Sequence, residues 1–523
     1  MRIKIQDGLK TSINVYLVLI LLILPLYAPN GYVMIGDIKY LFFRNMTLFF
    51  AAVTAMMCIA MAVMQDGERK KHIRLSYTDI MVLLYGAGSI MSWCCSADRT
   101  QAWWGAPGWY MGLLSQLMFV WIYFAVARWC DDFKGIAWAF YAGAAAVMAL
   151  GILNRYVFDP FSMFVGLDDW NRTHLLSTIG NQNWYCGYLS VASAVCIYFA
   201  CAEGKTRRAA GLTGCLLLFW TILTQGSEGG YLILLAEMTV VFLWSLKDRR
   251  KLLAVLNVWT CCPVAVFIGK YCIRFRGLML VEDGTLAGGL FWKGWLPVLF
   301  VLVIFSVLLC VREKRGYTDR LKAGTIQKIV LRTTGILLVI GVAVFLACQI
   351  WDPAWFFLGG RELLRITDSW GNGRGALWRI CAESFMQGSF SEKLIGVGPD
   401  CLSNVIYALY PVNDIIHAAG QWETAYYANA HNEWLNMLVN QGILGLLFYG
   451  GIFVTLFVRL WKHRHESSLA LMGLLAMAGY CAYGTVSFQQ AVSTPLIFAV
   501  MGISEAMLRK KTGETCKQKE LSV

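Results

Sequence analysis

The chain has 523 residues, of which 58% are hydrophobic and 15% are charged. Soluble domains carry about a quarter charged residues, so this composition excludes an ordinary soluble enzyme. Apolar stretches of roughly 20 residues recur along the whole chain, and each is long enough to cross a hydrocarbon core of about 30 Å. The sequence therefore predicts an all-α polytopic membrane protein with about 12–14 transmembrane helices.

The predicted spans follow one another from the N-terminus to the C-terminus. Their approximate bounds are 11–28, 45–64, 77–94, 109–129, 135–153, 184–202, 209–225, 230–246, 252–270, 292–311, 330–351, 442–461, 468–484 and 494–508. The first run follows a short basic start, as in a signal peptide. It is long, lacks a small-residue cleavage site and is followed by further spans, so we interpret it as a retained helix.

The basic residues indicate how the chain is oriented. With the N-terminus inside, about two thirds of the 45 Lys and Arg fall in cytoplasmic segments. The positive-inside rule then places both termini in the cytoplasm. Clusters such as 69–74 and 247–251 are interpreted as topology signals beside anionic lipid, which argues against a nucleic-acid partner.

On this topology one large extracytoplasmic loop covers 352–430. Its many aromatic residues argue against a disordered linker, and near-helical apolar spacing predicts short amphipathic helices over 376–386 and 401–410. We divide the chain into N-terminal transmembrane helices (1–170), a central membrane region that includes the loop (171–461), and C-terminal helices with a basic cytoplasmic tail (462–523).

A histidine beside the outer membrane surface is the candidate base. His431 precedes an apolar helix, and Glu433 follows two residues later. Histidine titrates near neutral pH and is the most frequent general base, so His431 is a catalytic candidate with Glu433 as its partner. A lone histidine at a helix entry is more often an interface residue or a cap.

Two arginines stand at the start of the first loop helix. Arg374 lies within a glycine-rich stretch, 371–375, Arg379 follows it, and arginine binds phosphate through a planar fork. These residues would suit an anion, although the glycines alone indicate only a flexible turn.

The other large outer segment, 154–183, ends in polar residues. Arg172 precedes Asn181 and Asn183 at the mouth of a span. Their amides would suit sugar hydroxyls, and equally they could cap the helix. The chain has no Asp-x-Asp motif and no Cys/His cluster with zinc spacing, so we expect neither a metal nor a cofactor.

Taken in order, these pieces resemble the O-antigen ligase/polymerase superfamily of bacterial membrane glycan transferases. The matching segments are Ser177–Asn183, Thr224–Gly230, Arg374 with Leu377–Trp378, Gly396–Asp400, and His431–Leu435 leading into Gly442–Leu446. The resemblance covers roughly 170–460, and it resides in the ordered set of motifs.

The resemblance implies a metal-independent glycosyltransferase in the inner (cytoplasmic) membrane. It would move a glycan from an undecaprenyl-diphosphate carrier to a hydroxyl of a glycan, lipid or protein acceptor at the outer face. In that reaction Arg374, Arg379 and Arg172 would offset the charge of the leaving diphosphate, and His431, oriented by Glu433, would be the base. Aromatic loop residues would stack on sugar rings; these are Trp378, Trp422, Tyr426 and Tyr427.

One residue departs from the family pattern. Members commonly carry an arginine in the Thr-x-Ser-Arg-Gly junction, where this chain has Glu228. Either Arg274 or Arg276 substitutes for it, or the site is shifted or inactive. Two alternatives therefore stay open beside the transferase, namely a glycolipid flippase or transporter and a catalytically silent scaffold of the same fold.

Overall fold

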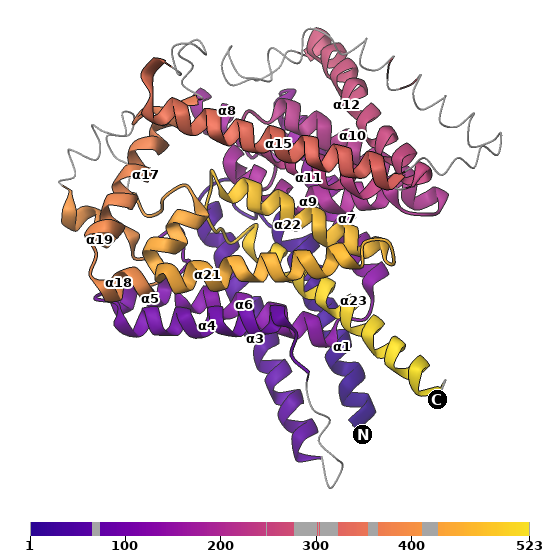
Figure 1. The fold of residues 1–523 in the computed structure, drawn as a ribbon, viewed down its shortest axis with the longest axis horizontal. Coiled ribbons are helices and arrows are strands. Elements are labelled where there is room, and N and C mark those ends of the chain that lie inside the picture. Colours follow the sequence, from indigo (N-terminus) through magenta and orange to yellow (C-terminus); the bar gives the residue numbers. More distant parts are fainter. Residues whose placement is uncertain are drawn as a thin grey trace.

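The computed structural model describes residues 2–64, 74–246, 248–276, 301, 303, 323–353, 364–410 and 427–521. These residues form a bundle of helices with one hairpin of two-residue strands, β1 (Leu175–Leu176) and β2 (Gly180–Asn181), as Figure 1 shows. Seven of the described helices are long and apolar enough to cross a membrane. The predicted all-α polytopic membrane fold is confirmed.

Each predicted span except 292–311, which lies almost wholly outside the described residues, coincides with a helical segment. The helices of the bundle are α1 (Arg2–Val18) continued by η1 (Leu19–Ile23) and α2 (Leu24–Leu26), α3 (Ile35–Val63), α4 (Tyr77–Cys95), α6 (Leu113–Trp129), α7 (Phe133–Arg155), α9 (Gln182–Cys201), α10 (Lys205–Thr224), α11 (Gly229–Ser245), α12 (Arg249–Arg276), α15 (Ala323–Ile350), α21 (Glu433–Lys462), α22 (Ser468–Gly484) and α23 (Thr494–Leu521).

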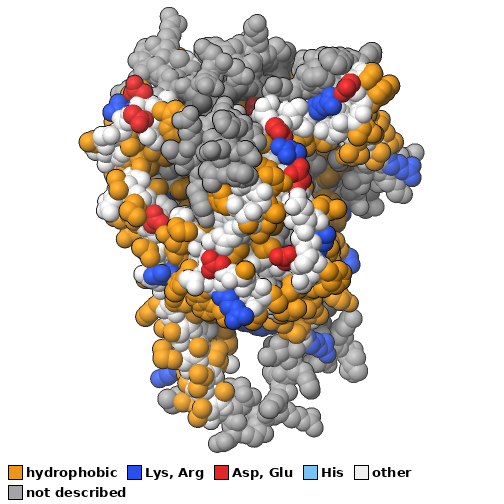
Figure 2. All heavy atoms as spheres, turned by 90° about the vertical axis from the view of Figure 1, so that its left-hand side faces the viewer, with side chains coloured by type: hydrophobic (Ala, Val, Ile, Leu, Met, Phe, Trp, Pro, Cys, Tyr) orange, Lys and Arg blue, Asp and Glu red, His pale blue; other side chains and the backbone are white. Residues whose placement is uncertain are grey.

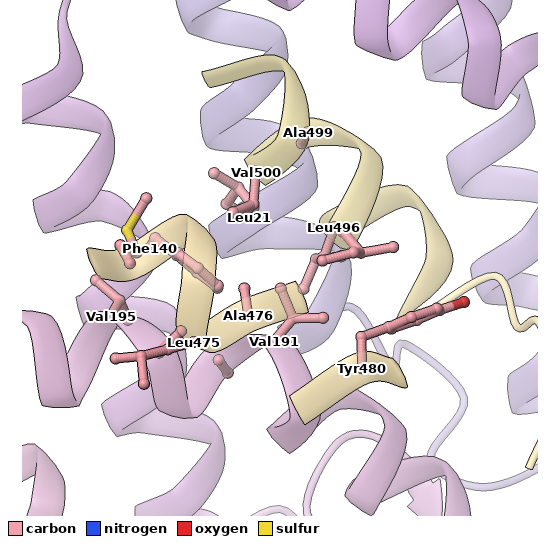
Figure 3. Packing of buried hydrophobic residues seen from close by; sticks show 14 of the residues in the cluster. Leu21, Phe140, Val191, Val195, Leu475, Ala476, Tyr480, Leu496, Ala499 and Val500 are labelled. Carbon is pink, nitrogen blue, oxygen red and sulfur yellow. The ribbon is translucent and has the colours of Figure 1, made fainter. Parts of the chain in front are cut away.

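The core of the bundle surrounds α9, which is the most buried of the seven candidate spans (89% against 17% for α3). A helix that is apolar on all sides belongs inside other helices. Val191 and Val195 of α9 pack near Leu475 and Ala476 of α22, with Leu21, Phe140 and Leu496 close by (Figure 3). This core holds α9 and α22 side by side.

The large loop contributes its own helices at one end of the bundle. They are α17 (Trp370–Gln387), α18 (Phe390–Ile395) and α19 (Leu402–Leu409), joined there by the short helices α5 (Arg99–Trp104) and α8 (Asp169–His174). The predicted helices 376–386 and 401–410 correspond to α17 and α19. Viewed onto this end, acidic and basic side chains are scattered over the described surface among hydrophobic ones (Figure 2).

Helix α21 begins earlier than the predicted span 442–461. Gly442 has a φ of +70° and separates a first section, which starts at Glu433, from the long apolar section. A Cβ at Gly442 would lie 2.4 Å from the backbone of Leu394, so only glycine permits this approach. The kink therefore fixes where the N-terminus of α21 meets the loop helices.

A buried lysine donates hydrogen bonds to the backbone carbonyls at the first helix break. Pro25 ends the opening helix, and the Lys39 Nζ of α3 donates hydrogen bonds to the carbonyls of Leu24 (3.0 Å), Pro25 (3.0 Å) and Tyr27 (2.9 Å). Among the described residues, only the Leu24 carbonyl has a backbone partner as well, the Tyr27 N–H at 3.3 Å, and hydrocarbon offers none to the others. The Thr178 hydroxyl also donates to the Pro25 carbonyl at 2.8 Å, which ties the β1–β2 hairpin to the same break.

We expect Lys39→Met to lower the free energy of unfolding by on the order of 3 kcal/mol, because it removes three hydrogen bonds and leaves the Tyr27 carbonyl without a described donor. Unfolding of the purified protein in mixed detergent micelles measures the difference. The control is Lys10→Met, which removes only exposed ion pairs with Asp7 and Asp131. Equal unfolding midpoints for the two variants would contradict this role of Lys39.

Candidate active site

A cavity of about 340 Å³ lies where the N-terminal ends of α9, α17 and α21 meet the segment between α22 and α23. Segments from distant parts of the sequence line it. The lining residues are Trp109, Asn181, Asn183, Trp184, Gly371–Arg374, Leu377, Tyr427–Asn429, His431, Val486–Phe488 and Gln490. Five predicted site residues, Asn181, Asn183, Arg374, Tyr427 and His431, are therefore brought together.

The glycine-rich stretch before Arg374 is a fixed turn rather than a flexible one. Gly371, Asn372 and Gly373 all have positive φ, and Gly375 has no room for a Cβ, which would lie 1.8 Å from the Thr367 carbonyl oxygen. This backbone places Arg374 at the start of the regular part of α17, facing the cavity.

Arg374 is half-buried and only partly paired. Its Nη1 donates to the Gly371 carbonyl at 3.2 Å, and its buried Nε has no hydrogen-bond partner. Burial lowers the pKa of Arg374, while Tyr483 and Glu228 act in the opposite direction. Arginine still carries its charge at neutral pH, so the cavity holds a cation with unused donors.

His431 occupies a strained position between the loop and α21. Its φ is +45°, a left-handed conformation that is uncommon outside glycine, and its backbone N–H donates to the Asn429 Oδ1 at 3.2 Å. Asn432 caps α21 by accepting from the Leu435 N–H at 3.0 Å, so the cap role considered for His431 belongs to its neighbour.

The imidazole of His431 is neutral in this setting. Burial and the nearby Arg374 charge lower its pKa to about 3. Its ring meets Phe488 edge to face, with centroids 5.1 Å apart. Neither ring nitrogen forms a hydrogen bond with a described residue, so the imidazole can accept a proton from a ligand in the cavity.

Glu433 lies apart from His431. Its side chain is buried in the bundle, where Tyr449 of the same helix donates a hydrogen bond to the carboxylate. No hydrogen bond joins Glu433 to His431 among the described residues, and the His431 ring contacts Phe488.

Trp378 supports the histidine segment without lining the cavity. Its indole N–H donates to the Ala430 carbonyl at 3.0 Å, directly before His431. Tyr427 does line the cavity, and its buried hydroxyl has no hydrogen-bond partner. Trp422 and Tyr426 lie outside the described residues.

The other two predicted arginines lie outside the cavity lining. Arg379 forms a two-point ion pair with Asp368 (3.0 and 2.8 Å) and a third contact with Glu383 (3.3 Å). Arg172 lies 3.9 Å from the Asp169 carboxylate on α8. Carboxylates already offset the charge of both side chains.

The two asparagines use one side-chain atom each to hold the structure. The Asn181 Oδ1 caps α9 by accepting from the Asn183 N–H at 2.8 Å, and the Asn183 Oδ1 accepts from the Ser227 hydroxyl at 2.8 Å. The helix-cap alternative therefore holds for Asn181, while sugar binding by the two amides stays a prediction.

The 224–230 junction borders this wall, and a buried arginine positions it. Arg155 donates to the Gln225 carbonyl at 2.5 Å and to the Thr173 carbonyl at 2.6 Å. Glu228 is exposed, and its charge acts on Arg374. The side chains of Arg274 and Arg276 lie outside the described part of the structure.

Sequence reasoning missed several lining residues, above all Trp109, Trp184, Phe488 and Gln490. They come from three segments whose proximity depends on the tertiary fold. It also missed the role of Asp400, which is buried and accepts from the N–H groups of Ala106 (2.7 Å) and Met111 (3.0 Å). Burial raises the pKa of Asp400 to about 6, against the effect of these two bonds.

The described residues contain no group of three or more His, Cys, Asp or Glu side chains arranged to hold a metal ion. The fold and cavity thus define a polytopic helical membrane protein with a cationic, amide-lined and aromatic cavity at one end.

Residues 293–450 match the family model described as O-antigen ligase. The match confirms the resemblance to the O-antigen ligase/polymerase superfamily and, at family level, supports a membrane glycan ligase or polymerase. It includes Arg374 and His431 but not the lining residues from the N-terminal half or from the segment after α22. No curated protein matches the chain.

Proposed function

We propose that this protein transfers a glycan from undecaprenyl diphosphate to an acceptor hydroxyl at the outer face of the cytoplasmic membrane. The observation that carries the proposal is the single cavity that Arg374 and His431 share within the matched segment. A half-buried cation with unused donors suits a diphosphate, and a neutral imidazole with free ring nitrogens suits a hydroxyl.

In the proposed reaction the acceptor oxygen attacks the anomeric carbon of the donor sugar. The bond between that carbon and the phosphate oxygen breaks, and the lipid diphosphate leaves with the electron pair. His431 takes the hydroxyl proton, and Arg374 offsets the charge that develops on the leaving group. Asn181, Asn183 and Tyr427 contact the hydroxyls of the bound sugars.

Glu228 takes a different role from the arginine of the family pattern. Its charge acts on Arg374 in the free protein, together with Tyr483, and no ion pair joins the two side chains among the described residues. The donor diphosphate then becomes the direct partner of Arg374. The site thereby works with one central arginine and no metal.

His431→Ala should leave the protein inserted in the membrane and abolish transfer, because the acceptor proton loses its base. Mass spectrometry of undecaprenyl-linked glycans in cells measures this. Accumulated single repeats would indicate a polymerase, and accumulated long chains would indicate a ligase. His174→Ala is the control, since His174 stacks on Trp170 outside the cavity. Normal product from cells with His431→Ala would refute the proposed base and favour a transporter or scaffold.

Arg374→Ala should weaken donor binding by about tenfold or more, because it removes a charge-assisted contact to diphosphate. Binding of undecaprenyl-diphosphate glycan to the purified protein provides the measurement. Arg379→Ala is the matched control on the same helix, and it should bind the donor normally because Asp368 and Glu383 already pair with Arg379. If both variants lose equal affinity, the donor site is not the cavity.

The pH dependence follows from the state of His431. Its pKa is lowered to about 3, so the imidazole of the free enzyme stays neutral and competent between about pH 5 and 8. We expect kcat/KM to show no acidic limb near the ordinary histidine value of about 6.5. A bound diphosphate opposes the Arg374 charge and raises the pKa, so the acidic limb of kcat should lie at higher pH than that of kcat/KM. An acidic limb of kcat/KM near pH 6.5 in the wild-type enzyme would contradict this.

A further inference from the structure

One wall of the cavity is built from aromatic side chains that the matched segment does not supply. The indoles of Trp109 and Trp184 meet edge to face at 5.6 Å, and Trp109 meets Phe488 in the same way at 4.7 Å. Phe488 in turn contacts the His431 ring at 5.1 Å. The proposed base therefore stands at the end of a continuous aromatic row, here called the aromatic wall (Trp109, Trp184 and Phe488).

A small hollow of about 20 Å³ adjoins the cavity along the aromatic wall. It shares Trp109, Trp184 and Gln490 with the cavity, and none of its lining side chains is ionisable at neutral pH. Gly108 borders the hollow, and a Cβ there would have no atom within 4 Å. This region offers space next to half-buried indoles without any charge that would select a phosphate.

Polar groups also line the cavity beside the aromatic wall. Among the described residues, the buried Gln490 Oε1 and Tyr427 hydroxyl have no hydrogen-bond partner, although buried polar atoms are normally paired. Both residues line the cavity. Apolar ring faces with a few convergent amide and hydroxyl groups match the chemistry of a neutral sugar, which combines C–H faces with hydroxyls.

The indole of Trp109 is held in place before any ligand arrives. Its loop is fixed from both ends by Asp400, which accepts from Ala106 and Met111, and the Gln101 side chain donates to the Asp400 carbonyl at 2.9 Å. Tyr110 adds a hydrogen bond to Asp37 at 2.6 Å. Such a loop binds a ligand with little further loss of conformational entropy.

We propose that the aromatic wall, with Gln490 and Tyr427, is a subsite for the acceptor sugar. This inference rests on the proposed function, because it assigns the acceptor to the side of the cavity that reaches His431 through Phe488. The donor diphosphate takes the Arg374 side, where the cation is. The acceptor subsite thus draws Trp109 and Trp184 from the N-terminal half and Phe488 and Gln490 from the segment after α22. Residues 293–450 supply Tyr427, the proposed base and the phosphate contact.

The test is saturation-transfer NMR of the purified full-length protein in detergent. The probe is the free repeat-unit oligosaccharide released by mild acid from the host cell's own envelope glycan. It is applied to the His431→Ala protein, in which turnover cannot occur, and then to the same protein with Trp109→Ala, Trp109→Phe or Trp104→Ala. Trp104 is an exposed indole of the neighbouring helix α5 outside the cavity, so its variant is the matched control.

We expect the ligand signal to survive Trp104→Ala and Trp109→Phe and to be lost in Trp109→Ala, whose affinity should fall about tenfold. In the otherwise wild-type enzyme, Trp109→Ala should raise the KM for acceptor and leave the KM for donor unchanged. A signal undiminished by Trp109→Ala would overturn the subsite, and a change confined to the donor KM would overturn its assignment to the acceptor. Oligosaccharide binding that depends on Trp109, together with normal product in His431→Ala cells, would retain the sugar subsite and reject the proposed base.

Discussion

Polar backbone groups that are left over where a helix breaks inside this bundle have to find partners within the protein, because hydrocarbon provides none. Three buried charged side chains meet that requirement. Lys39 donates hydrogen bonds to the carbonyls around Pro25, and Arg155 donates to a carbonyl of the 224–230 junction. Asp400 accepts hydrogen bonds from the loop that carries Trp109. Each joins segments that are far apart in the sequence, and together they position three walls of the cavity.

The polar atoms around the cavity differ from those at the helix breaks in how many of them have hydrogen-bond partners. At the helix breaks, donors and acceptors are matched closely, as in the three bonds of Lys39. Around the cavity, the Nε of Arg374, the hydroxyl of Tyr427 and the Oε1 of Gln490 are buried and unpaired. Leaving such groups unpaired costs stability, so their gathering around one space indicates a place prepared for a polar ligand.

The positions of the spans could be predicted because hydrophobic runs are local, and the loop helices could be predicted from apolar spacing. The site could be predicted only in part. Arg374 and His431 lie in recognisable motifs, whereas Trp109 and Phe488 reach the cavity through packing that no local pattern reveals. The partners of individual side chains were also hidden, since Glu433 is bonded to Tyr449 and Arg379 to Asp368. Sequence proximity to His431 or Arg374 did not determine either contact.

The Asp400 contact also limits how modular the matched segment is. Residues 293–450 would fit poorly if they were grafted into another membrane scaffold, because Asp400 would be buried there without the N–H groups of Ala106 and Met111. An isolated buried carboxylate is costly, and the grafted turn would have to reorganise around it. The two parts therefore have to change together in evolution and in engineering, and a chimera that exchanges acceptor recognition has to carry residues 98–112 along with the turn at Asp400.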